Sequence, residues 1–148
     1  MTKAYKYAIV YFIAFSLLLV TSGALLFESK IGFSITEIAE YYLGNEDKFI
    51  VAKTPAGVLK IVLPHLFAYG LLAMVLLHFL IFTKYRDSSH LKFLIYAVFI
   101  SAFFEISSPF MVIYVSEYFA YLKLVSFVLF EGLIIYLAWL LFKSIVKN

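Results

Sequence analysis

Long segments without charged side chains take up most of this 148-residue chain, and they constrain the fold more than any other feature. Residues 7–27 and 61–83 contain no Asp, Glu, Lys or Arg. Residues 93–116 and 119–142 are similarly long and apolar but contain a few charged side chains. Each segment reaches the roughly 20 residues that a helix needs to cross a hydrocarbon core of about 30 Å. The sequence therefore predicts an all-α protein built on a bundle of four transmembrane helices.

The composition supports this class and excludes several others. Hydrophobic residues make up 65% of the chain and charged residues 14%, whereas soluble domains have roughly 45–50% and about 25%. Only the connection 28–60 is long enough to form structure of its own, so we expect residues 1–148 to form a single integral membrane domain. The absence of cysteine excludes disulfides, thiolate metal sites and covalently attached c-type haem. No basic patch for nucleic acid is visible.

The distribution of basic residues sets the expected orientation. Lys84, Arg86 and Lys92 lie in the short connection between the second and third segments, and further lysines lie near both termini. Short loops with this positive charge stay in the cytoplasm. We therefore expect cytoplasmic termini and an extracytoplasmic loop 28–60, with Lys123 among the charges on the outer side.

A short amphipathic helix is expected in this first extracytoplasmic loop. Ser34 and Glu37 have the spacing of a capping box, in which each side chain bonds the other residue's backbone amide. Apolar residues follow at helical spacing, and Gly44 is placed to end the helix. We predict a helix over residues 35–43 that lies on the outer surface with its tyrosines at headgroup level, or caps the bundle. A substrate lid is the alternative.

Two carboxyl groups fall at one level of the predicted bundle. At 1.5 Å per residue, Glu105 lies about 16 Å and Glu131 about 18 Å below the outer ends of their segments. Tyr69 lies at a similar depth, and Ser108 follows Glu105 by one turn. Ionisable groups at this depth are functional candidates. Glu105 and Glu131 either share a proton in a proton or ion site with Tyr69 and Ser108, or are neutral groups bonded within the bundle. In both cases we expect Glu105 to be protonated.

A proline follows Glu105 closely in the third segment. Pro109 has no amide hydrogen, so it frees a backbone carbonyl and predicts a kink. A free carbonyl at membrane depth must be bonded by neighbouring side chains or by water.

The histidines suggest haem b as a cofactor. His65 and His78 both lie in the second segment, and His90 lies at its cytoplasmic connection. At about 100° per residue, His78 is turned about 140° from His65, so one partner helix cannot serve both. Bis-histidine ligation would need His78 with His90, or histidines from two chains. The alternative is that they form hydrogen bonds within the bundle or at an interface. No catalytic motif and no spacing typical of metal ligands is present.

From Gly32 to about Trp139 the chain resembles an uncharacterised family of small four-helix bacterial inner-membrane proteins. The shared features are Tyr41-Tyr42-Leu43-Gly44, His65-Leu66-Phe67, His78-Phe79, Glu105-Ile106-Ser107-Ser108 and Phe119-Ala120-Tyr121-Leu122. The chain departs from the family pattern at Pro109-Phe110 and at Glu131. The resemblance implies the topology and a bacterial inner-membrane location. It marks His65, His78 and Glu105 without giving them a role.

These observations predict a non-enzymatic membrane protein. The first hypothesis is a membrane subunit or small partner protein in an electron-transfer or energy-converting complex, with haem b bound. It would contact lipid and would assemble as a homo-oligomer or within a membrane protein complex. The alternatives are a proton- or ion-coupled transport protein that uses Glu105 and Glu131, and a purely structural assembly partner.

Overall fold

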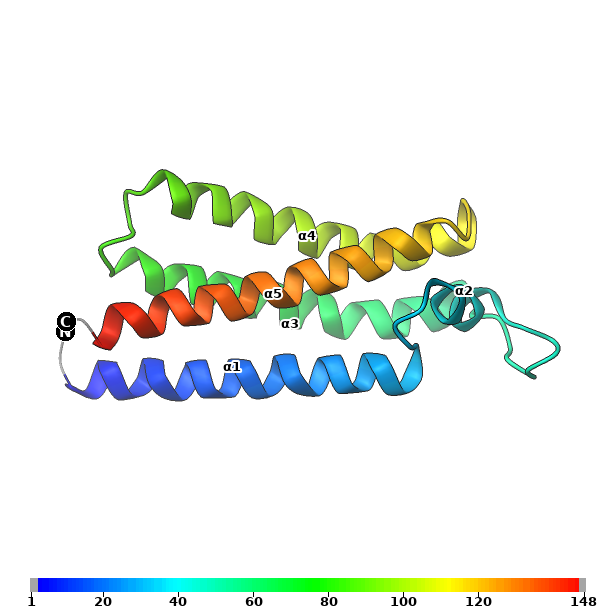
Figure 1. Ribbon diagram of the computed structural model, residues 1–148, viewed down its shortest axis with the longest axis horizontal. Helices are drawn as coiled ribbons and strands as arrows, with labels where there is room; N and C mark the ends of the chain where they lie inside the picture. The colour runs from blue at the N-terminus through cyan, green and yellow to red at the C-terminus, as the bar shows by residue number, and fades with distance from the viewer. Residues whose placement is uncertain (1–2, 147–148) are drawn as a thin grey trace.

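Four long helices and one short helix form the computed structural model, which describes residues 3–146 (Figure 1). The helices are α1 (Lys3–Lys30), α2 (Ile35–Leu43), α3 (Pro55–Ile81), α4 (Ser89–Tyr114) and α5 (Phe119–Val146). Within the described residues there is no β-strand beyond an isolated bridge. All four long helices are long and apolar enough to cross a membrane. The predicted four-helix membrane bundle with a short extra helix is confirmed.

The long helices extend beyond the predicted segments because capping residues set several of their ends. α3 begins at Pro55, since the Thr54 side chain accepts a hydrogen bond from the Gly57 amide. α4 begins at Ser89, with Ser88 in the same capping role. The apolar segments therefore predict where the helices lie, whereas capping residues outside these segments determine where several helices begin.

The antiparallel pair α4 and α5 is the centre of the bundle. α4 and α5 pack against each other most extensively, α3 packs against both, and α1 packs mainly against α5. The start of α1 and the end of α5 lie at the same end of the bundle, and α2 lies at the opposite end (Figure 1). α1 is therefore a peripheral helix held by one neighbour.

An apolar core fills the end of the bundle away from α2. Its fully buried members include Leu76, Leu80, Leu137 and Leu141. At this end α1 also meets α3, because the rings of Phe12 and Phe79 pack edge to face with centroids 5.7 Å apart. This half of the bundle is closed by packed side chains.

The short helix α2 caps the other end. Its capping box forms as predicted, with Ser34 Oγ accepting from the Glu37 amide and Glu37 Oε2 accepting from the Ser34 amide, both at 3.1 Å. Ile38 and Tyr42 are fully buried in a cluster with α4 and α5. The sequence predicted that α2 either lies on the outer surface or caps the bundle. The second position is therefore correct. Placement of Tyr42 at headgroup level is wrong, because its side chain is inside the protein.

The loop after α2 is tied back to the helix. Lys48 forms a 2.8 Å salt bridge with Glu40, and the Lys53 amide donates to the Tyr42 carbonyl at 2.9 Å. The hydrogen bonds from Lys48 and from Asn45 hold the pKa of Glu40 below its usual value. These bonds fix α2 and its loop over the end of the bundle.

Gly44→Ala should loosen this cap. Gly44 has φ +85°, and an added Cβ would lie 2.7 Å from the backbone nitrogen of Ala52. Such a strained residue costs about 1–3 kcal/mol. We expect faster tryptic cleavage after Lys48 and Lys53 in Gly44→Ala. The control is Gly132→Ala, where an added Cβ meets nothing within 4 Å. Equal cleavage of the two variants would contradict the cap described here.

Candidate functional site

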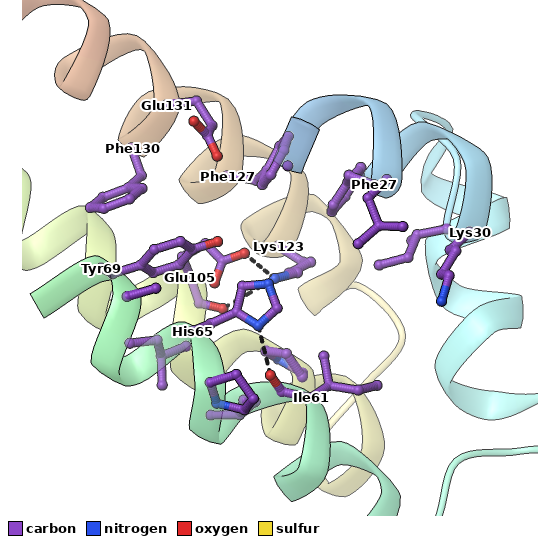
Figure 2. Close-up of a pocket in the computed structure, with 18 of the residues that line it drawn as sticks. Phe27, Lys30, Ile61, His65, Tyr69, Glu105, Lys123, Phe127, Phe130 and Glu131 are labelled. Carbon is purple, nitrogen blue, oxygen red and sulfur yellow. Dashed lines mark hydrogen bonds and ion pairs between the residues drawn. The ribbon is translucent and has the colours of Figure 1, made fainter. Parts of the chain in front are cut away.

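A cavity of about 620 Å³ lies in the half of the bundle nearest α2 (Figure 2). This volume is within the range of roughly 300–1,000 Å³ that is typical of small-molecule sites. All five helices contribute to its walls, which are mainly apolar. The apolar lining includes Leu19, Val20, Leu26, Phe27, Ile61, Val62, Leu72, Ile106, Phe127 and Phe130.

The cavity opens sideways, between α1 and α3. α2 covers one end of it with Tyr41 and Tyr42, and the apolar core closes the bundle beyond the other end. The rim residues Leu26 of α1 and Pro64 of α3 are exposed, Leu26 by 52%. Both helices are long and apolar enough to cross a membrane, and the exposed side chains of Lys30 and Lys60 belong to the same lining.

A buried ion pair lies at the inner wall of the cavity. The Lys123 ammonium of α5 donates to the Oε1 carboxylate oxygen of Glu105 in α4. It also donates to the Glu105 backbone carbonyl at 3.3 Å. Glu105 is 3% exposed and Lys123 6% exposed. Lys123 therefore donates to two oxygen atoms of the same residue, the side-chain and the backbone oxygen of Glu105 (Figure 2).

Pro109 makes the second of these oxygens available. In a continuous helix the carbonyl of Glu105 would accept from the amide of residue 109, but proline has no amide hydrogen. The carbonyl instead accepts from Lys123 Nζ and, at 3.1 Å, from Ser108 Oγ. This confirms the expectation that side chains would bond a carbonyl freed by Pro109. α4 continues to Tyr114.

The ion pair corrects two expectations. Lys123 was predicted among the outer charges, but it is buried, because its long side chain reaches from the second turn of α5 into the bundle. Glu105 was expected to bond a second carboxyl, a serine or a tyrosine, but its side chain bonds a lysine. The signal for this pair was present in the sequence, since the third predicted segment contains the acidic Glu105 and the fourth contains the basic Lys123.

The other members of the predicted polar site lie around the same cavity. Tyr69 packs against Phe130 with ring centroids 4.3 Å apart, and Figure 2 shows its hydroxyl directed toward the ion pair. Glu131 lines the cavity from α5. Its Oε2 atom is buried and has no hydrogen-bond partner among the described residues. Ser108 is buried behind the ion pair.

The three histidines lie in different environments. His65 lines the cavity, and its Nδ1 donates to the Ile61 carbonyl at 2.6 Å, which leaves Nε2 as an acceptor in the neutral ring. His78 is exposed on the outer face of α3, and exposed His90 lies 3.0 Å from the Tyr136 hydroxyl. Within residues 3–146 no cluster of three or more His, Asp or Glu side chains is arranged to hold a metal ion.

Tyr42 is a site residue that the sequence analysis did not identify as one. Tyr42 lines the cavity, and its hydroxyl is buried and has no hydrogen-bond partner among residues 3–146. Burial, with a smaller contribution from the charge of Glu105, raises the pKa of Tyr42. The apolar pattern of α2 placed Tyr42 on the buried face, but only the structure shows that this face borders a cavity.

Comparison with known proteins gives a family for most of the chain. A family model described as a transmembrane helical domain matches residues 32–148. The chain belongs to this family. The result confirms the resemblance to a membrane protein family that the sequence suggested. No curated protein and no solved structure matches the chain.

The family domain contains the ion pair but not every wall of the cavity. The matched residues include α2 to α5, and therefore Glu105, Lys123, Tyr42 and Glu131. α1 ends before the match begins and supplies the remaining wall. The matched domain thus provides Glu105, Lys123, Tyr42 and Glu131, and α1 completes the wall of the cavity around them.

Glu105→Gln should destabilise the protein strongly. It would leave the buried Lys123 without a counter-charge, which typically costs about 3–5 kcal/mol. The double variant Glu105→Gln/Lys123→Met removes both charges and should recover most of the loss. Unfolding in a graded mixture of mild detergent and dodecyl sulfate measures this, with Glu28→Gln as the exposed control. If Glu105→Gln is as stable as the wild type, the ion pair described here is incorrect.

Proposed function

We propose that this protein binds a lipid-soluble molecule, which enters the cavity from the membrane between α1 and α3. The observation that supports this most directly is an apolar cavity with two lining residues, Tyr42 and Glu131, that each have a buried polar atom without a partner among the described residues. The protein would act by binding and not as an enzyme, as a membrane subunit or small partner of a larger assembly.

The unpartnered groups favour a ligand with a polar head over an ordinary acyl chain. Acyl chains could fill the apolar part of the cavity but could not bond the Tyr42 hydroxyl or Glu131 Oε2. Each unsatisfied buried polar group costs about 1–3 kcal/mol. A molecule with a polar head and an apolar tail removes this cost, and its tail can leave between α1 and α3.

Transport is the alternative that Glu131 supports. Glu131 lines the cavity and has a carboxyl oxygen free to accept a proton or to bind an ion. The opposite half of the bundle is packed with fully buried leucines. A proton- or ion-coupled cycle would therefore need a second conformation in which this core opens. Binding needs only the conformation described here, so it is the simpler function.

Haem b binding in an electron-transfer complex is the second alternative. His78, Met74 and Gly70 are exposed on one outer face of α3, so a haem at His78 would lie between two chains of a homo-oligomer. A visible spectrum of the purified protein tests this, since bound haem gives a Soret band that His78→Ala would remove. Absence of the band in the wild type would exclude haem.

Filling the cavity should prevent binding. Gly23 lines the cavity, and a Cβ added there would lie 3.5 Å from Glu131 Oε1, an ordinary contact. The larger side chain of Gly23→Leu would then occupy cavity space. We expect Gly23→Leu to lose the lipid-soluble molecules that copurify with the wild type, as measured by native mass spectrometry and lipid extraction. Gly132→Leu, on an exposed face of α5, should retain them. Equal loading of both variants would exclude this cavity as the site.

We also propose that the protein lies in a bacterial inner membrane with cytoplasmic termini, so that the cavity opens to the outer leaflet. The chain has no cysteine, so a single introduced thiol reports its own location. Asp47→Cys in the loop after α2 should react with a membrane-impermeant maleimide on intact cells. Asp87→Cys, between α3 and α4, should react only after lysis. The opposite pattern would reverse the orientation and place the cavity in the inner leaflet.

A further inference from the structure

We infer that the head group bound in this cavity is an uncharged ring with carbonyl oxygens, as in a lipid quinone, and that Lys123 and Tyr42 donate hydrogen bonds to it. This inference rests on the proposed function, because it specifies the ligand of the same site.

Lys123 has a hydrogen-bond donor to spare. An ammonium group has three N–H donors, and within the described residues its acceptors are two oxygens of Glu105. The nitrogen also lies 5.9 Å from the centroid of the Phe27 ring. Since both Lys123 and Phe27 line the cavity, the remaining donor is available to an oxygen atom of a ligand.

Tyr42 offers a second donor. Tyr42 lines the cavity, its side chain is 1% exposed, and its hydroxyl is buried without a partner among the described residues. Tyr69 adds a further hydroxyl in the same cavity. Lys123, Tyr42 and Tyr69 are therefore donors that complement a head group with acceptor oxygens, whereas Glu131 Oε2 and His65 Nε2 are acceptors that such a head group leaves unbonded.

The charge balance excludes an acid at this position. Glu105 already neutralises Lys123, so a carboxylate or phosphate beside the pair would leave an uncompensated negative charge at membrane depth, near Glu105 itself. Burial and a neighbouring like charge both disfavour such a group. A cationic head group would be repelled by the positive charge of Lys123. A neutral carbonyl accepts the hydrogen bonds without changing the charge.

Aromatic rings around the ion pair favour a planar head. Phe27 and Phe127 are stacked with centroids 4.1 Å apart, and Tyr69 lies against Phe130. All four rings line the cavity (Figure 2), and aromatic pairs gain from stacked or edge-to-face contact. A quinone combines a planar ring, two carbonyl oxygens and a long apolar tail, so it fits the rings, the donors and the lateral opening.

The competing ligand is an acidic lipid held at the rim. Lys30 and Lys60 both line the cavity and have no carboxylate within salt-bridge distance in the described structure. An anionic head group would bind these exposed lysines and would not need Tyr42 or Lys123. The two ligands therefore depend on different residues.

The experiment titrates purified protein with decyl-substituted benzoquinone and, separately, with decanoate, by isothermal calorimetry in a mild detergent. Tyr42→Phe removes only the hydroxyl, and loss of one hydrogen bond should weaken quinone binding about 2- to 10-fold. Tyr121→Phe, at a side chain that is 57% exposed, should bind like the wild type. Glu105→Gln/Lys123→Met removes the other donor and should weaken quinone binding at least as much, which provides a second test if Tyr42→Phe folds poorly.

The outcomes separate this inference from the proposed function. If decanoate binds more tightly than the quinone, or if quinone affinity is unchanged in both Tyr42→Phe and the double variant, the inference is wrong. In that case the proposed function stands, provided that Gly23→Leu still abolishes binding. If Gly23→Leu leaves the binding of both probes unchanged, the proposed function fails together with the inference.

Discussion

The buried pair of Glu105 and Lys123 is the interaction on which the half of the bundle nearest α2 depends. An isolated charge at this depth is costly, so neither residue could remain there alone. Their pairing joins α4 to α5, and the missing amide of Pro109 supplies a second oxygen for the lysine. Lys123 and Glu105 bond each other within the wall formed by α4 and α5. The space on the other side of the pair therefore does not have to be filled by protein, and a cavity lies there.

The position of α1 turns this space into a lateral site. α1 is attached mainly to α5 and meets α3 through the rings of Phe12 and Phe79 at the end away from α2, and nearer α2 both helices line the cavity. α2 covers this end of the cavity with Tyr41 and Tyr42. The exposed part of the lining therefore lies on α1 and α3, which is where the proposed membrane-soluble ligand would enter.

The sequence predicted the features that depend on local chemistry. Four apolar segments gave four helices, and the Ser34 and Glu37 capping box with Gly44 gave the bounds of α2. The site was harder to predict from the sequence, because it depends on which side chains of different helices contact each other. Depth alone aligned Glu105 with Glu131, whereas side-chain reach pairs Glu105 with Lys123. The sequence placed Tyr42 on the apolar face of α2 but at headgroup level, and both its burial and its unpartnered hydroxyl are properties of the assembled bundle.

The ion pair also has a consequence for biosynthesis. A lysine or an acid near the centre of a single inserting helix adds about 2.5–3.5 kcal/mol to the free energy of insertion. α4 and α5 are joined by a connection of only a few residues, and each brings the counter-ion of the other. Inserted as a hairpin, they enter the bilayer with Glu105 and Lys123 neutralising each other. The translocation machinery should therefore release α4 and α5 together, and α1, which packs mainly against α5, can join the finished hairpin afterwards.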